Sequence, residues 1–156
     1  MAKLQTDLNE FIVLLNSLGV EYLVVGGHAV AFHGHPRFTG DIDFFIRTTP
    51  QNAERVLRVL AEFGFGSLSI AERDLLEPHQ VIQLGRPPNR IDLLTSISGV
   101  DFDAAWPSRV EGTLDEQRVF FLGLEDLLKN KEASGRKKDL ADVEKLRAVA
   151  KRHGAG

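Results

Sequence analysis

The sequence predicts an α/β (α+β) protein, a small mixed and twisted sheet with helices packed mainly on one side. Short apolar runs typical of strands alternate with longer segments whose apolar residues recur at helical spacing. After residue 122 the pattern is helical only, which predicts a helical C-terminal segment. At 156 residues, 43% of them hydrophobic and 26% charged, the chain is long enough for one core. We therefore expect a single domain over residues 1–156, with a core over 1–122 and the helical segment over 123–156.

The first half of the chain is expected to hold three helices and two strands. Residues 5–18 carry apolar side chains at helical spacing and end at a glycine. Residues 21–25 form an apolar, β-branched strand, and a short helix follows over residues 27–32. Residues 42–46 read as the second strand. Thr49 and Pro50 then open a helix over 51–63.

The second half is expected to add strands in hairpins and then two helices. Residues 66–77 are ambiguous and are compatible with a short strand followed by a helical turn. Strands are predicted over 79–84 and 90–95, joined by a turn whose two prolines interrupt any ladder. The remaining predicted elements are a short helix over 101–106, a strand and turn over 109–116, a strand over 117–122, and helices over 124–133 and 137–151.

Composition excludes several classes of protein and site. The formal charge of −3 argues against a general nucleic-acid coat. The absence of cysteine excludes disulfides and thiolate metal sites. No apolar run approaches the ~20 residues of a spanning helix, and the first ten residues lack the apolar core of a signal peptide. A cytoplasmic location and no membrane partner are expected.

Two carboxylates occupy alternate positions of the second strand. Because side chains alternate between the two faces of a strand, Asp41 and Asp43 share one face, while Ile42 and Phe44 share the other. Neighbouring carboxylates repel each other, and a divalent cation such as Mg²⁺ or Mn²⁺ removes that conflict. The alternative is a solvent-exposed strand face on which both aspartates are hydrated.

Gly26-Gly27 and Asp92 add to the acidic pair. Two glycines at a strand end allow a tight turn and a close approach by a ligand. Asp92 stands within an apolar strand, where a carboxylate is costly unless it is paired or ligated. The predicted hairpin would bring Asp92 beside the acidic pair. A salt bridge from Asp92 to Arg90 or Arg86 is the alternative.

The order of these motifs is similar to the signature of a known superfamily. An apolar strand, Gly26-Gly27, thirteen further residues and Asp41-Ile42-Asp43 resemble the DNA polymerase beta-like nucleotidyltransferases. Within them, the chain looks most like small stand-alone (minimal) nucleotidyltransferases and the AbiE-type toxin group. Asp92 matches the position of the third carboxylate, and residues 131–142 resemble the basic closing motif of that group.

This resemblance implies a metal-dependent transfer of a nucleoside monophosphate from a nucleoside triphosphate to a hydroxyl-bearing acceptor, with release of pyrophosphate. The implied catalytic residues and ligands of two Mg²⁺ or Mn²⁺ ions are Asp41, Asp43 and Asp92. The implied nucleotide-binding residues are Gly26, Gly27, His28, Arg37, Thr39, Lys131 and Arg136. Two alternatives stay open: Arg37 in a surface ion pair, and Lys131 and Arg136 on a solvent-exposed basic face.

The partners follow from the same resemblance. A nucleoside triphosphate is the expected small-molecule partner, and the acceptor stays open between a small molecule, a protein and a tRNA end. A partner protein or a homodimer is compatible with the small size. The alternative function is a non-catalytic nucleotide-binding or toxin–antitoxin partner module on the same fold. A plain structural domain that binds neither metal nor nucleotide is the third alternative.

Overall fold

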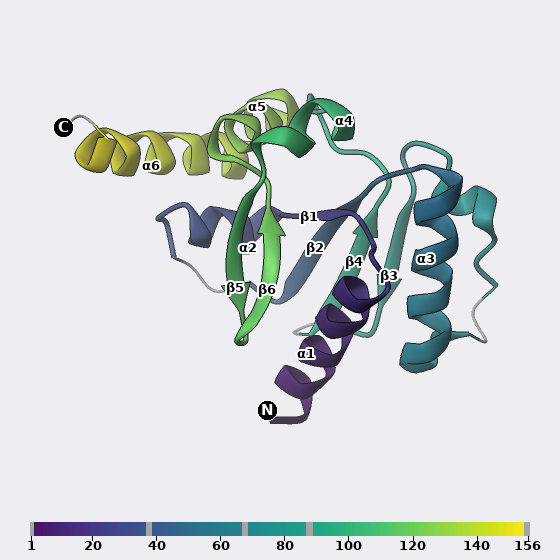
Figure 1. Ribbon diagram of the computed structural model, residues 1–156. Coiled ribbons are helices and arrows are strands. Elements are labelled where there is room, and N and C mark those ends of the chain that lie inside the picture. Colours follow the sequence, from purple (N-terminus) through teal and green to yellow (C-terminus); the bar gives the residue numbers. More distant parts are fainter. Residues whose placement is uncertain (1, 37–38, 67–68, 87–88, 155–156) are drawn as a thin grey trace.

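Six strands form one mixed sheet in the order β3-β4-β2-β1-β6-β5 (Figure 1). The structure is a computed structural model that describes residues 2–36, 39–66, 69–86 and 89–154. The strands are β1 (Tyr22–Val25), β2 (Asp41–Ile46), β3 (Val81–Leu84), β4 (Arg90–Leu94), β5 (Val110–Leu114) and β6 (Gln117–Phe121). Sequential neighbours β1–β2, β3–β4 and β5–β6 pair antiparallel, whereas β1–β6 and β2–β4 pair parallel. The predicted mixed sheet and the predicted hairpin of β3 and β4 are confirmed, and β5 and β6 form a further antiparallel pair.

Within the described residues, the α-helices agree with the prediction in number and order, with local differences. They are α1 (Ala2–Ser17), α2 (Gly26–Phe32), α3 (Pro50–Leu60), α4 (Phe102–Ala105), α5 (Leu124–Ser134) and α6 (Lys137–Gly154). The predicted helix over 51–63 changes to a π-helix at Ala61–Phe65, where Gly64 has a φ of +100°. Residues 66–77 contain a 3₁₀ turn at Glu72–Leu75 and no strand among those described. β3 begins only at Val81, because His79 has a φ of +64°, which a strand does not accommodate.

The two faces of the sheet differ in character. Strand registry puts Val24 opposite Phe44 on one face, which α1 covers through Phe11, whose ring lies 5.7 Å from that of Phe44. On the other face Phe45 packs edge-on against Phe102 of α4 at 5.1 Å. Asp43 shares this second face with Phe45, because they are two residues apart. The acidic positions therefore lie on the face away from α1.

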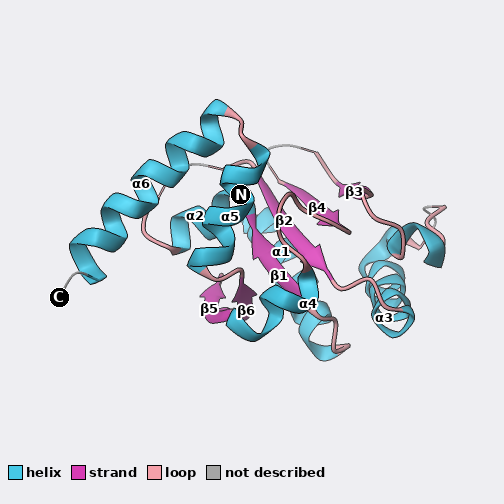
Figure 2. Cartoon of the chain, turned by 90° about the horizontal axis from the view of Figure 1, so that it is seen from above, coloured by secondary structure: helices cyan, strands magenta, loops and turns pink. Residues whose placement is uncertain are grey.

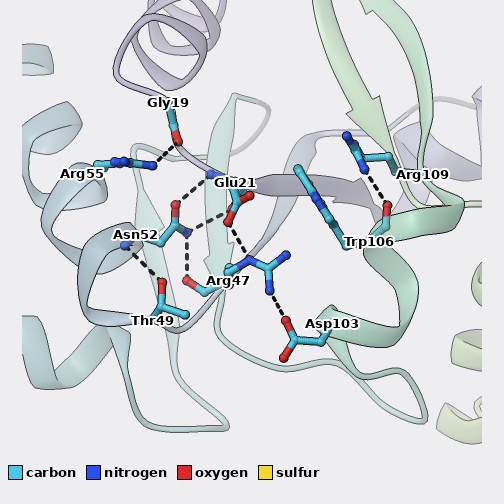
Figure 3. A network of polar contacts seen from close by, with 9 residues as sticks. All are labelled: Gly19, Glu21, Arg47, Thr49, Asn52, Arg55, Asp103, Trp106 and Arg109. Carbon is cyan, nitrogen blue, oxygen red and sulfur yellow. Dashed lines mark hydrogen bonds and ion pairs between the residues drawn. The ribbon is translucent and has the colours of Figure 1, made fainter.

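A buried amide fixes the far ends of β1 and β2 (Figure 3). Asn52, at the start of α3, accepts a hydrogen bond from the Glu21 backbone N–H at 2.8 Å and donates to the carbonyls of Glu21 at 3.0 Å and Arg47 at 2.8 Å. The Thr49 hydroxyl caps the helix by accepting from the Asn52 N–H at 3.2 Å. One side chain thus ties α3 to both strands, which holds the acid-bearing strand in register. None of the described helices combines the length and the apolar character needed to cross a membrane.

Candidate functional site

Three carboxylates converge at one end of the sheet. Asp41 and Asp43 come from β2, and Asp92 comes from β4, where the parallel registry places it directly opposite Asp43. Each side chain offers an oxygen within 4.8 Å of the oxygens of the other two. Asp92 is buried, with 5% of its surface exposed. The sequence-predicted hairpin therefore delivers Asp92 to the face that carries the acidic pair.

Arg90 lies on the same face, two residues before Asp92. Its Nε donates to Asp92 Oδ1 at 2.8 Å, and its Nη2 donates to Asp92 Oδ2 at 3.1 Å and to Asp41 Oδ2 at 2.8 Å. The salt bridge that the sequence left as an alternative for Asp92 is thus present together with the carboxylate cluster. One guanidinium faces three carboxylates, so the cluster retains an excess of negative charge.

The environment of Asp43 shows the effect of this excess. The pKa of Asp43 is raised to about 7, most of all by burial and then by the charges of Asp41 and Asp92 and a hydrogen bond with Asp92, while the charge of Arg90 lowers it. A cluster of oxygen donors that keeps an excess of negative charge suits a hard divalent cation such as Mg²⁺ or Mn²⁺. The three aspartates therefore fit the metal that the resemblance implies.

A cavity of about 600 Å³ opens beside the acids. Its walls combine the acids with glycine, threonine and basic residues, and they include Gly26, Gly27, Thr39, Asp41, Asp43, Asp92, Lys131, Arg136 and Lys138. His28 lines a second cavity of about 230 Å³, to which Thr39 and Asp41 also contribute. Burial lowers the pKa of His28, which favours its neutral form. Arg37, the remaining predicted nucleotide-binding residue, lies outside the described residues.

Positions 26 and 27 require glycine because they lie very close to the side chains of Asp43 and Thr39. Gly26 has a φ of +69°, and a Cβ added to it would clash with the Asp43 carboxylate. A Cβ at Gly27 would lie 3.0 Å from the Thr39 hydroxyl oxygen. That hydroxyl donates to the Asp41 carbonyl at 2.9 Å. Only glycine lets the start of α2 lie against the acids in this way.

Replacement of Gly26 by Ala is expected to lower the free energy of unfolding by roughly 2–3 kcal/mol, because a strained positive φ is combined with a clash. Gly64→Ala is the matched control: its φ is +100°, but nothing lies within 4 Å of the added Cβ. The control should lose only about 1 kcal/mol. Urea unfolding curves measure both values, and equal losses would show that Asp43 does not confine position 26.

The C-terminal basic residues form a buried network between α5 and α6, which pack against each other beside the sheet (Figure 2). Lys131 is only 5% exposed, and its Nζ lies 3.0 Å from Asp139 Oδ1 and 3.1 Å from Asp142 Oδ2. Arg136 donates from Nε to Asp139 Oδ2 at 2.7 Å, yet 73% of its side chain is exposed. Both basic residues line the larger cavity, but the charge of Lys131 is already balanced by two carboxylates.

Asp139 should make stability depend on acid pH. Burial by itself raises the pKa of Asp139, but hydrogen bonds from Ser134, Lys131 and Arg136 outweigh it and lower the pKa from 3.8 to about 2. The ionised carboxylate then contributes about 2 kcal/mol above pH 4, and this contribution is lost as the pH falls through 2. Urea unfolding of wild type and Asp139→Asn should give a stability difference that falls by roughly half by pH 3. A difference that stays constant with pH would contradict this.

Comparison with known proteins identifies the family. A family model described as "Nucleotidyltransferase of unknown function (DUF6036)" matches residues 1–152. The chain belongs to this family. A solved structure, an antigenic nucleotidyltransferase-like protein from Paracoccidioides brasiliensis, is 21% identical, with 96% of this chain and 76% of that chain covered and a TM-score of 0.54. At this identity the likeness concerns the fold. A comparison with curated proteins found no match.

The resemblance to the nucleotidyltransferases is thus confirmed for family and fold. Within this nucleotidyltransferase, the sequence did not indicate the contact between Arg90 and Asp41, which bridges the two strands at 2.8 Å. The signal that could have indicated this contact is the spacing of two between Arg90 and Asp92, which puts both side chains on the face of the sheet that carries the acids. The partners of Lys131 carried no such signal, because Asp139 and Asp142 lie on a different helix.

Proposed function

We propose that this protein is a metal-dependent nucleotidyltransferase that moves a nucleoside monophosphate from a nucleoside triphosphate to an acceptor hydroxyl. The observation that carries the proposal is the convergence of Asp41, Asp43 and Asp92, whose oxygens lie within 4.8 Å of one another. Membership of a nucleotidyltransferase family supports it. The cavity beside the acids, about 600 Å³ in volume, supplies room for a triphosphate and its nucleoside.

Asp41, Asp43 and Asp92 would hold Mg²⁺ or Mn²⁺, with two ions shared among the three carboxylates. When bound, such cations neutralise phosphate oxygens and lower the pKa of a coordinated hydroxyl. Oxygen donors alone surround the position, which is the ligand set that these hard cations prefer.

In the proposed reaction the acceptor oxygen forms a bond to the α-phosphorus, and the bond from that phosphorus to the bridging oxygen breaks. Pyrophosphate leaves with the electron pair, and a carboxylate oxygen of Asp92 takes the hydroxyl proton. Such a transfer depends on positioning and charge neutralisation more than on covalent participation by the protein. Gly26 and Gly27 let the phosphates approach the backbone.

Basic side chains around the larger cavity would balance the phosphate charge. Arg136 and Lys138 line that cavity with exposed side chains, and arginine donates to phosphate through two parallel N–H groups. Lys131 contributes less, because Asp139 and Asp142 already hold its ammonium. Arg37 and Thr39 complete the proposed set.

The test is an assay of purified protein with α-labelled nucleoside triphosphates and a panel of small-molecule, protein and tRNA acceptors. We expect label transfer and pyrophosphate release in Mg²⁺, none in EDTA, and recovery when excess Mg²⁺ is added back. Transfer that persists in EDTA would refute metal dependence.

A second candidate is a non-catalytic nucleotide-binding or toxin–antitoxin partner module on the same fold. The observation that favours it is Arg90, which holds oxygens of Asp41 and Asp92 that a metal would use. ATP binding without turnover on any acceptor of the panel would favour this module over the transferase.

A further inference from the structure

Arg90 engages the acids with a geometry that competes with a metal ion. Its fork bonds both oxygens of Asp92, at 2.8 and 3.1 Å, and its Nη2 also reaches Asp41 Oδ2 at 2.8 Å. Charge-assisted bonds from arginine to a carboxylate are strong when two N–H groups act together. While they are in place, the oxygens of Asp92 face a guanidinium and not a cation site.

Arg90 also supplies the positive charge that the cluster needs. Among the described residues, the ion pairs of Asp41 and Asp92 come from Arg90, whereas Lys131 and Arg136 are paired with acids of α6. Three like charges at this spacing repel each other strongly unless a cation lies between them. Arg90 therefore keeps the three carboxylates in the arrangement that a metal requires. At the same time it occupies carboxylate oxygens that the metal would need as ligands.

We propose that Arg90 is a resident counter-cation of the acidic cluster, which a divalent metal must displace before it binds Asp41 and Asp92. This inference rests on the metal dependence of the proposed function. The protein then binds metal only above a concentration at which the ion outcompetes the guanidinium. Arg90 acts as a positioning residue, since it organises the ligands without joining the transfer.

The structure provides a place for the displaced side chain. Arg90 also lines the cavity of about 230 Å³, together with Asp7 and Asp115. Both of these carboxylates are exposed, and neither forms an ion pair within the part of the chain that the structure describes. A rotation of the Arg90 side chain into this cavity would turn the guanidinium toward these carboxylates and would leave β4 in place.

The decisive experiment measures the affinity of the protein for Mn²⁺ alone, from the electron paramagnetic resonance signal of the free ion. Arg90→Gln removes the competing charge, so we expect it to bind Mn²⁺ about tenfold more tightly than wild type. Arg86→Gln is the matched control, since Arg86 is exposed, belongs to the same hairpin and forms no ion pair among the described residues. Its affinity should equal that of wild type. Equal or weaker binding by Arg90→Gln would overturn the inference.

Thermal unfolding separates the two effects of Arg90, which are to hold the carboxylates together and to compete with the metal for them. In EDTA, Arg90→Gln should melt below wild type because the carboxylates lose their counter-charge, and saturating Mn²⁺ should raise its melting temperature by more than it raises that of wild type. A smaller rise than in wild type would count against displacement.

Two further measurements apply if Arg90→Gln does not fold. Arg90→Lys keeps the charge but loses the fork, and its Mn²⁺ affinity should exceed that of wild type. In wild type, the Nε–H resonance of Arg90 should move toward that of a free arginine when Mg²⁺ is added. A resonance that does not respond while Mg²⁺ binds would overturn the inference.

The outcomes also distinguish this inference from the proposed function. Mn²⁺ binding by wild type that Arg90→Gln does not tighten refutes the role of Arg90 and leaves the metal-dependent transferase intact. Tighter binding without transfer to any acceptor supports the role of Arg90 and refutes the transferase. Absence of Mn²⁺ binding in every variant refutes both.

Discussion

Replacement of Asp43 by Asn is expected to abolish nucleotidyl transfer, with kcat/KM reduced by at least about 10³-fold. Asp43 lies opposite Asp92 in the parallel pair β2–β4 and directly beneath the glycine that opens α2. The amide keeps the shape of the side chain but removes its charge and one oxygen donor, so the site loses both a ligand and its attraction for a cation. Initial rates of label transfer measure the loss.

The variant should fold normally, which separates loss of activity from loss of structure. Removal of one of three mutually repelling carboxylates should leave it at least as stable as wild type in EDTA. Asp126→Asn, on the first turn of α5 and outside both cavities, is the matched control and should retain full activity. Full activity of Asp43→Asn would exclude Asp43 from the chemistry.

The sequence predicts the faces of the strands well, because side chains alternate with a period of two. This alternation places Asp41 with Asp43, and Arg90 with Asp92, before any coordinates are considered. The pairing of β4 with β2 is different, since it joins residues 49 positions apart and no local pattern specifies a contact of that separation. The prediction that Asp92 lies near the acidic pair therefore depended on the hairpin and the resemblance together.

The sequence also left the roles of the C-terminal basic residues open. For Lys131 and Arg136, the sequence was compatible with both an exposed basic face and a phosphate site. In the structure, Lys131 is buried and paired with two acids. The cause is the turn at Gly135, whose φ of +68° ends α5 and lets α6 pack against it. A helical pattern fixes which residues share a face of one helix, but it does not fix which face the next helix covers. The π-helix after Leu60 was missed for a similar reason, since residues 51–63 carry an unbroken helical pattern.

Replacement of Lys131 by Met is expected to cost about 3–5 kcal/mol of unfolding free energy, because it leaves Asp139 and Asp142 buried without the ammonium they share. Both carboxylates are almost fully buried, at 1% and 3% exposure. Lys129→Met is the matched control, with the same change on the same helix at an exposed position, and it should stay within about 0.5 kcal/mol of wild type. Urea unfolding at pH 7 gives both values.

A comparison of Lys131 with Arg136 decides between a structural and a phosphate-binding role for these C-terminal basic residues. If Lys131 served phosphate and not the packing of α5 on α6, Lys131→Met would keep its stability and raise only the KM for the nucleotide. Arg136→Gln should show that second behaviour, because 73% of the Arg136 side chain is exposed at the cavity wall. We therefore expect mainly stability to fall in Lys131→Met and mainly nucleotide KM to rise in Arg136→Gln. Burial commits Lys131 to the fold, whereas the exposed Arg136, whose Nε bonds Asp139, can still present its other N–H groups to a ligand.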